Sequence, residues 1–230
     1  MIDWHSHILP AVDDGSRDIE ESLGLLHILQ TSGVDTVIAT PHFYADRISA
    51  EDFFAARDQS AAALRRAMPA DAPRLLLGAE VRYYAGISRL ENLKDFRIEG
   101  SRQLLLEMPV SHWSEYALRE LVELAGIPGV ELLLAHVERY RALQSDDAWD
   151  RLLQAGIRMQ SNASNFLSWR TRGAALRQLW AGEIHCIGSD CHNLKYRPPK
   201  IGEAYEWIAK KSDARFLPAF DAFGHKLLGH

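Results

Sequence analysis

The amino-acid sequence predicts an α/β fold built on a mostly parallel sheet. Short apolar runs alternate with helical patterns along all 230 residues. Nearly every apolar run is followed by a helix or another crossover, and such alternation implies parallel strands joined by right-handed connections. Seven strands in one continuous sheet are compatible with an open doubly wound sheet or with a closed barrel. The first strand is not followed by a glycine-rich phosphate loop, which disfavours the nucleotide-binding versions of the open sheet.

The expected strands are short apolar runs bounded by glycine, proline or polar residues. VDTVIAT, RLLLGAE and ELLLAH are typical of strands that are buried on both faces, as in a parallel sheet. We expect strands at residues 1–7, 34–40, 74–80, 103–108, 131–136, 157–162 and 184–190.

Helical periodicity fills the intervals between these strands. Asp18 is a typical N-cap for the first helix, and Gly33 ends it. The apolar stripe of this helix consists of Ile19, Leu23, Leu26 and Leu29. Ser49 and Ser114 are suited to cap two later helices. Helical patterns cover residues 18–33, 49–68, 114–126, 146–155, 172–181, 201–211 and 213–228.

Composition indicates one globular domain over residues 1–230, with 47% hydrophobic and 25% charged residues. The net charge of −5, without any block of Lys or Arg, argues against non-specific binding of nucleic acid. The chain has no apolar stretch approaching the roughly 20 residues of a membrane span and no signal-peptide pattern. Two cysteines suggest a reducing compartment. We therefore expect a cytoplasmic protein that is not inserted in a membrane.

Metal-capable side chains occur at or just past the carboxyl ends of six of the seven expected strands. In a parallel barrel these ends meet on one face, where active sites lie, and core packing gives no reason to place His, Glu and Asp there. The nine candidates are His5, His7, Asp14, His42, Glu80, Glu107, His136, Asp190 and His192. Imidazole and carboxylate together suit zinc, manganese or iron. Nine ligands exceed the need of one ion, so we expect two or three ions, with Glu80 shared between them.

The other five histidines fit no strand end and are expected to be structural or exposed: His27, His112, His185, His225 and His230.

Cys191 and Arg197 have the spacing of a cysteine-based phosphatase loop. Such a loop needs converging backbone amides, usually with glycines and a following helix N-terminus. CHNLKYR has no glycine and precedes two prolines, which resist a helical turn. Asp190 next to the cysteine would also raise the pKa of the thiol. We therefore interpret the spacing as coincidence and expect Cys191 to pack behind a strand end.

Several motifs together resemble a known family: DWHSHILPAVDDG, ATPH, GAEV, LLEMP, LLAHVERY and GSDCHN. In this order they resemble the PHP (polymerase and histidinol phosphatase) superfamily, and more closely its CpsB/YwqE-type bacterial metal-dependent protein-tyrosine phosphatases of capsule and exopolysaccharide synthesis. The resemblance runs from residue 1 to about residue 205. It implies a distorted seven-stranded (β/α) barrel, similar to a TIM barrel, with a trinuclear site that is commonly manganese-dependent.

The resemblance also implies which residues hold each ion. His5, His7, Glu80 and Asp190 would hold the first. Glu80, Glu107 and His136 would hold the second. Asp14, His42 and His192 would hold the third.

Arg139 and Arg197 match arginines that contact phosphate in the family. The implied reaction is attack of metal-activated hydroxide on a phosphotyrosine monoester, with His42 or a metal-bound water as general acid if one is needed. The implied substrate is the phosphotyrosine-bearing tail of a bacterial tyrosine kinase that controls capsular or exopolysaccharide synthesis. Four aromatic residues are candidates to line the substrate cleft: Tyr44, Tyr83, Tyr84 and Trp113.

Four alternatives stay open on the sequence. The first is a small-molecule phosphatase of the same superfamily, such as a histidinol-phosphate phosphatase. The second is a metal-dependent nuclease, which the lack of a basic stripe disfavours. The third is a non-catalytic module that keeps the metal site for structure. The last is the cysteine phosphatase. The sequence leaves the oligomeric state open.

Overall fold

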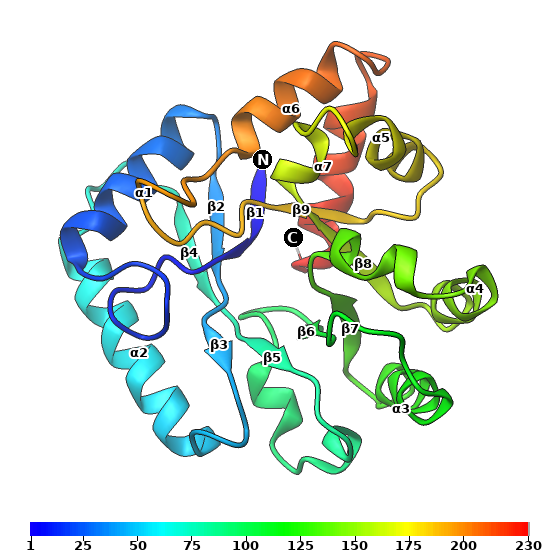
Figure 1. Ribbon diagram of the computed structural model, residues 1–230. Helices are drawn as coiled ribbons and strands as arrows, with labels where there is room; N and C mark the ends of the chain where they lie inside the picture. The colour runs from blue at the N-terminus through cyan, green and yellow to red at the C-terminus, as the bar shows by residue number, and fades with distance from the viewer. Residues whose placement is uncertain (230) are drawn as a thin grey trace.

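The computed structural model describes residues 1–229 and shows a curled parallel sheet surrounded by helices (Figure 1). One part of the sheet has the order β1-β2-β4, formed by Ile2–Ser6, Thr36–Ala39 and Arg74–Leu77. The other part has the order β3-β5-β6-β7-β8-β9, formed by His42–Phe43, Glu80–Arg82, Gln103–Glu107, Glu131–Leu134, Arg158–Asn162 and Cys186–Gly188. All pairings are parallel. A parallel bridge between Ser6 and Cys191 connects β1 to the end of β9.

All seven predicted strand regions contain strand, which confirms the α/β prediction, but the strand is broken in two places. The second region contains β2, and the short strand β3, which was not predicted, follows just beyond it after Pro41. Proline has no N–H group to donate to a ladder. The third region consists of β4 and β5, with Gly78 between them, and a β-carbon at Gly78 would lie 3.1 Å from Ile98 Cγ1. At both breaks the chain changes from one part of the sheet to the other.

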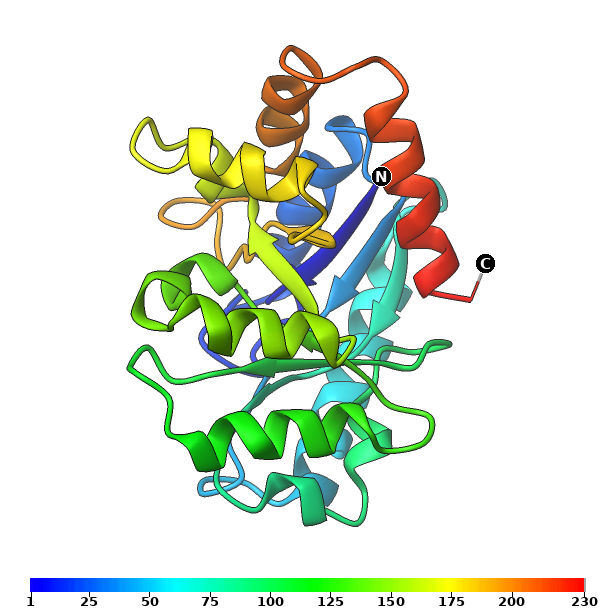
Figure 2. The same cartoon turned by 90° about the vertical axis from the view of Figure 1, so that its right-hand side faces the viewer.

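The helices lie outside the curl of strands (Figures 1 and 2). They are α1 Ile19–Thr31, α2 Ala50–Ala67, α3 Glu115–Ala125, α4 Asp146–Gln154, α5 Arg172–Trp180, α6 Ile201–Ala209 and α7 Phe216–Leu227. The predicted caps are confirmed, because Asp18, Ser49 and Ser114 each accept a hydrogen bond from a backbone N–H in the first turn. Five short 3-10 helices in the loops of the described chain were not predicted: η1 Ile87–Arg89, η2 Leu93–Phe96, η3 Val137–Arg139, η4 Arg141–Leu143 and η5 Ala163–Phe166. None of the helices described over residues 1–229 has the length and apolar character of a membrane span.

The interior of the curled sheet is filled by an apolar cluster towards the amino ends of the strands. This interior cluster consists of Ile2, Trp4, Ile38, Leu76, Ile98, Leu105, Leu133, Ala135, Cys186 and Leu228. The pairing of β1 is irregular between Asp3 and Ser6, which is where the strand changes from these apolar residues to polar ones. The apolar layer therefore forms a floor beneath the polar carboxyl ends.

The helix α7 covers the amino end of this interior. Leu228 just beyond it belongs to the interior cluster. A β-carbon at Gly224 would lie 3.3 Å from Ile2 and 3.4 Å from Trp4, so the helix packs directly on β1, and Figure 2 shows α7 beside the chain's N-terminus. The family motifs fade after Tyr205, and in this last part of the chain α7 closes the curled sheet at the amino ends of its strands.

Candidate metal centre

The nine predicted residues come together at the carboxyl ends of the strands. Three groups of metal-capable side chains overlap there, and the ligand atoms of each group lie within 4.8 Å of one another. The groups are His7, Asp14, His42 and His192; His5, His7 and Asp190; and His42, Glu80 and Glu107. His136 is in none of these groups, but its Nε2 lies 2.7 Å from Glu80 Oε1 and 3.5 Å from Glu107 Oε1. The division of these residues among individual ions stays a prediction.

Glu80 lies at the centre of the cluster. Its carboxylate is 1% exposed and lies 2.7 Å from His136 Nε2, 2.9 Å from His42 Nδ1, and 3.3 Å from the Nε2 atoms of both His5 and His7. It follows Gly78 and Ala79, where the strand passes from one part of the sheet to the other. This position explains how one carboxylate reaches four histidines from three different segments.

The donor atoms of the cluster fit divalent cations. His5 Nε2 and His7 Nε2 face each other at 3.1 Å, a distance at which two lone pairs repel unless a proton or a cation lies against them. Among residues 1–229, nine buried side-chain atoms lack a partner in hydrogen-bonding geometry, and five of them belong to predicted ligands. These five are His42 Nδ1, Glu80 Oε2, Glu107 Oε2, His136 Nδ1 and His192 Nε2. Buried polar atoms are normally satisfied, so metal coordination explains why four of these atoms are left open. His136 is the exception, because it approaches Glu80 with its other nitrogen, Nε2.

The pKa values of two imidazoles in the cluster are strongly shifted. Burial disfavours the protonation of His7, but the hydrogen bond to Asp13 and the nearby carboxylate of Glu80 outweigh it and raise the pKa of His7 to about 10. Burial, together with the charges of His7 and Arg197, lowers the pKa of His192 to about 4. The centroids of these two rings are only 4.0 Å apart, yet their pKa values shift in opposite directions. Protonation of His7 therefore opposes protonation of His192.

The carboxylates remain ionised despite their burial. Burial opposes the ionisation of Glu80, but the charge of His5, the hydrogen bond with His136 and the close approach of His42 hold the pKa of this carboxyl well below its usual value. Burial also opposes the ionisation of Asp190, and nearby positive charges again outweigh it and lower the pKa. These carboxylates therefore stay negatively charged because positive groups lie next to them, as buried charges require.

Asp13 is a site residue that the sequence analysis missed. Its Oδ2 accepts hydrogen bonds from His7 Nδ1 at 2.7 Å and from the backbone N–H of His42 at 2.9 Å, so it orients two predicted ligands. A β-carbon at Gly15 would lie 2.2 Å from the carbonyl oxygen of His7, so only glycine allows the loop to return this close. The signal was the DDG motif, from which only the exposed Asp14 was chosen; Asp14 Oδ1 lies 3.5 Å from His42 Nε2.

The strand β8 corresponds to the one predicted strand, of seven, that has no candidate ligand. It supplies two amide side chains that orient ligands on other segments. Gln160 Oε1 accepts hydrogen bonds from the backbone N–H of His136 at 2.6 Å and from His5 Nδ1 at 3.3 Å. Asn162 Nδ2 donates to Asp190 Oδ2 at 2.7 Å. Partners of this kind fix the tautomer and orientation of metal ligands. The signal that could have identified them is the sequence IRMQSN, in which Gln160 and Asn162 come at the end of a buried strand.

Two predicted ligands have a strained backbone. Of the residues from 1 to 229, three non-glycine residues have positive φ angles: Ala11 at 56°, His136 at 31° and Asp190 at 52°. Such conformations persist where the surroundings enforce them and are common at functional sites. Gly188, just before Asp190, lies so close to β1 that a β-carbon there would be 2.6 Å from His5 Cβ.

Arg139 and Arg197 border the cluster on one side. Arg139 Nη2 and Arg197 Nη2 lie 2.5 Å and 2.7 Å from Asp190 Oδ2, and both side chains remain more than a third exposed. They line a cavity of about 400 Å³ together with Glu138, Asn162, Ser164, Ser189, Asp190, Tyr196, Pro198 and Lys200. Lys200 is a third cation in this arginine pocket that the sequence analysis did not select.

The two cysteines are buried and free. Cys191 belongs to an apolar cluster and is fully inaccessible, which confirms the prediction that it packs behind a strand end. Burial, with the charges of Asp3 and Asp190 nearby, raises the pKa of its thiol. Arg197 pairs with Asp190 instead. A nucleophilic thiolate at this position is therefore excluded on physical grounds.

The four other histidines within residues 1–229 lie away from the cluster, as expected. His27 and His112 are exposed, and His225 is partly buried near Asp35. His185 is at the amino end of β9, where burial and the charge of Arg158 lower its pKa to about 4. His230 lies outside the described residues.

Three of the four predicted cleft aromatics are placed as expected, and one is not. Tyr44, Tyr83 and Tyr84 line a cavity beside the cluster. Trp113 is instead 3% exposed, packs on Tyr140 with ring centroids 4.9 Å apart, and donates to the carbonyl of Pro109. Its ring completes the core beneath α3, so the prediction for Trp113 is wrong.

Comparison with known proteins agrees with this architecture. The family described as "Capsular polysaccharide synthesis, CpsB/CapC" matches residues 1–219. The chain is 29% identical to the tyrosine-protein phosphatase YwqE of Bacillus subtilis over 224 residues, which cover 95% of this chain and 87% of that protein. It is 31% identical to the tyrosine-protein phosphatase CpsB of Streptococcus pneumoniae over 235 residues, which cover 94% and 92%.

Solved structures lead to the same group. A crystal structure from a study of YwqE from Bacillus subtilis and CpsB from Streptococcus pneumoniae, described as unique metal-dependent tyrosine phosphatases, matches with a TM-score of 0.84 at 27% identity. The match covers 99% of this chain and 94% of that one. A chain of an archaeal ribonuclease P matches with a TM-score of 0.62 at 14% identity, which is a likeness of fold alone.

A curled parallel sheet with imidazoles and carboxylates converging at its strand ends is typical of metal-dependent hydrolases. The match over residues 1–219 shows the particular group: this chain belongs to the CpsB/CapC family.

Proposed function

We propose that this protein is a metal-dependent protein-tyrosine phosphatase that hydrolyses phosphotyrosine monoesters. The observation that carries the proposal is a buried cluster of open imidazole and carboxylate atoms directly beside the exposed guanidinium groups of Arg139 and Arg197. Relatives at 29% and 31% identity over most of the chain carry the name tyrosine-protein phosphatase.

The residues proposed to hold two or three divalent ions are the nine of the cluster: His5, His7, Asp14, His42, Glu80, Glu107, His136, Asp190 and His192. Manganese, zinc and iron all suit a donor set that mixes imidazole with carboxylate, and the resemblance to the CpsB/YwqE-type phosphatases makes manganese the preferred ion of this proposal. Bound divalent ions would lower the pKa of water enough to supply a nucleophile near neutral pH. Asp13, Gln160 and Asn162 hold the ligands in place.

Arg139 and Arg197 are proposed to bind the phosphate oxygens. Both pair with Asp190 Oδ2, whose negative charge is shared between them, and both side chains remain more than a third exposed, so each has N–H groups available to an anion. Planar guanidinium groups suit phosphate geometry and offset the charge that develops in the transition state. Lys200 adds a third positive charge to the same cavity.

His42 is proposed as a ligand rather than as a proton donor. Its Nδ1 lies 2.9 Å from Glu80 and its Nε2 lies 3.5 Å from Asp14, so both nitrogens face predicted ligand groups. A leaving tyrosinate has a conjugate acid with a pKa of about 10 and needs little help from a general acid.

The proposed substrate is the phosphorylated, tyrosine-bearing tail of a bacterial tyrosine kinase in capsular or exopolysaccharide synthesis, in the cytoplasm. The description of the matching family as capsular polysaccharide synthesis supports this setting. A net charge of −5 without a basic block supports a protein substrate over nucleic acid.

We further propose that residues 1–230 form one domain whose sheet is the distorted seven-stranded barrel of the PHP superfamily. Two facts support this. The segments β2 and β3 follow each other directly, as do β4 and β5, so each pair acts as one broken strand. The bridge between Ser6 and Cys191 brings the first and last strands together.

Turnover of a phosphotyrosine peptide before chelation, after chelation and after manganese is restored tests the proposal. We expect activity to disappear with the chelator, to return with manganese, and to survive Cys191→Ala. Histidinol phosphate serves as the comparison substrate and is expected to be turned over far less efficiently. Activity that persists in protein shown to be free of metal would contradict the metal-dependent mechanism, and preferred turnover of histidinol phosphate would assign the small-molecule activity instead.

A further inference from the structure

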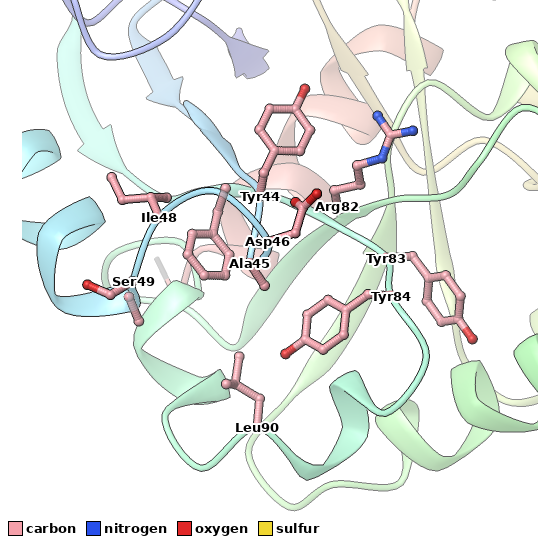
Figure 3. A pocket seen from close by; sticks show the side chains of 11 residues that line it. Tyr44, Ala45, Asp46, Ile48, Ser49, Arg82, Tyr83, Tyr84 and Leu90 are labelled. Carbon is pink, nitrogen blue, oxygen red and sulfur yellow. The ribbon is translucent and has the colours of Figure 1, made fainter.

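A second cavity, of about 640 Å³, lies beside the metal centre, and Figure 3 shows the side chains that line it. We name it the aromatic pocket. It lies between the loop that follows β3 and the segment that follows β5. Its lining residues include Phe43, Tyr44, Ile48, Arg82, Tyr84 and Leu90. The lining is mainly apolar and aromatic, so this cavity is unsuited to the phosphate group itself.

One end of the aromatic pocket is shared with the metal centre. The ring of Tyr44 lies 5.1 Å from the ring of His42, centroid to centroid. Arg82 Nη1 lies 3.8 Å from Glu107 Oε2, and the Arg82 guanidinium lies 5.7 Å from the centre of the Tyr44 ring. Figure 3 shows Tyr44 and Arg82 at one end of the cavity and Leu90 at the other. A substrate bound at the metal centre therefore has this cavity within reach of its neighbouring groups.

The wall of the aromatic pocket is held in place by a buried carboxylate. Glu120 on α3 is 2% exposed and accepts hydrogen bonds from Tyr83 Oη at 2.8 Å and from the backbone N–H of Gly86 at 2.8 Å. Its Oε1 also accepts from the backbone N–H and the hydroxyl of Ser88, at 3.3 Å and 3.1 Å. Ile48 and Leu90, on the two walls, rest on the apolar core. The cavity is thus formed before any ligand binds, which lowers the entropic cost of binding.

We infer that the aromatic pocket binds an aromatic or large aliphatic side chain that neighbours the phosphotyrosine in the substrate peptide. The inference rests on the proposed function and adds a determinant of sequence preference to it. The volume lies within the range of roughly 300–1,000 Å³ that is usual for ligand sites and easily holds one aromatic side chain. The rings of Tyr44 and Tyr84 and the guanidinium of Arg82 offer the stacking surfaces that an aromatic ring prefers.

Phosphotyrosine peptides with phenylalanine at single positions on either side, each compared with alanine, test the inference. We expect one neighbouring position at which phenylalanine raises kcat/KM by about 10-fold or more, the usual worth of a buried apolar contact. Leu90→Asp places a charge at the far end of the cavity and is expected to abolish this preference. The phenylalanine and alanine peptides would then have about the same kcat/KM. Val122→Asp, on an exposed face of α3, is the matched control and is expected to keep both the preference and the activity.

A second variant, Tyr84→Ser, repeats the measurement in case Leu90→Asp does not fold, and thermal unfolding checks both. The absence of any preference at every position, while peptides are turned over, would overturn the aromatic pocket alone. A preference that both variants retain would also overturn it. If neither phosphotyrosine peptides nor p-nitrophenyl phosphate are turned over in manganese, the proposed function fails together with the pocket.

Discussion

The two ends of the curled sheet carry similar residue types but treat them differently. At the amino end, both oxygens of Glu131 have partners: Oε1 pairs with Arg102, and Oε2 lies 2.5 Å from Arg158 Nη1 and 2.6 Å from Gln103 Nε2. At the carboxyl end, Glu80 Oε2 has no partner in hydrogen-bonding geometry although it is buried. Satisfied charges at one end contribute to stability, whereas open donor atoms at the other end are available to a ligand.

The strongest test of this difference is Glu80→Gln. The amide keeps the shape of the side chain but removes the charge that four histidines surround, so we expect kcat/KM for a phosphotyrosine peptide to fall by more than about 100-fold, since partners outside the ligand shell already cost 10–100-fold. Metal content after dialysis should fall with it. A Glu80→Gln protein with normal metal content and normal turnover would remove the central role of this carboxylate.

A smaller effect is expected for Asp13→Asn. Asp13 accepts hydrogen bonds on both oxygens, from His7 and His42 on Oδ2 and from the backbone N–H of Gly15 on Oδ1. An amide can accept on one side only, so the orientation of His7 or the loop at Gly15 is lost. We expect affinity for manganese to fall about 10–100-fold.

The manganese titration of Asp13→Asn separates orientation from folding. Activity should be recovered at higher manganese concentration if Asp13 only positions its neighbours. An unchanged titration midpoint would show that Asp13 has no influence on the metal centre.

The smallest effect is expected at the amino end, for Glu131→Gln. Because Glu131 is partly exposed, the loss of its ion pairs should cost about 1 kcal/mol or less of unfolding free energy, and turnover should stay unchanged. Burial opposes the ionisation of Glu131, but Arg158, Gln103 and Arg102 outweigh it and lower its pKa. A carboxyl with a lowered pKa stabilises the fold above its unfolded pKa, and this contribution is lost as the pH falls through the folded value.

The difference in unfolding free energy between Glu131→Gln and the unaltered protein should therefore be largest near neutral pH. It should shrink as the pH falls below about 4.5. Chemical unfolding at several pH values measures it. A loss of activity without a loss of stability would contradict the division between the two ends.

The sequence by itself determined the strands, the caps and the candidate ligands. Hydrophobic periodicity and local composition are properties of short stretches of sequence. The strand regions and the N-caps Asp18, Ser49 and Ser114 could therefore be predicted. The nine ligand candidates could be found because each follows a strand, and parallel strands bring their carboxyl ends to one face. The CpsB/YwqE-type motifs predicted the family because each motif is a short, contiguous stretch of sequence.

Only the tertiary structure decided which side chains support the ligands and where the substrate has room. Asp13, Gln160 and Asn162 look like ordinary loop and strand residues until distant segments place them beside His7, His136 and Asp190. The breaks at Pro41 and Gly78, the burial of Trp113 and the closure of the sheet by α7 likewise depend on long-range packing. The aromatic pocket exists because Glu120 on α3 binds the segment after β5. Such contacts join residues far apart in the chain, and no local pattern records them.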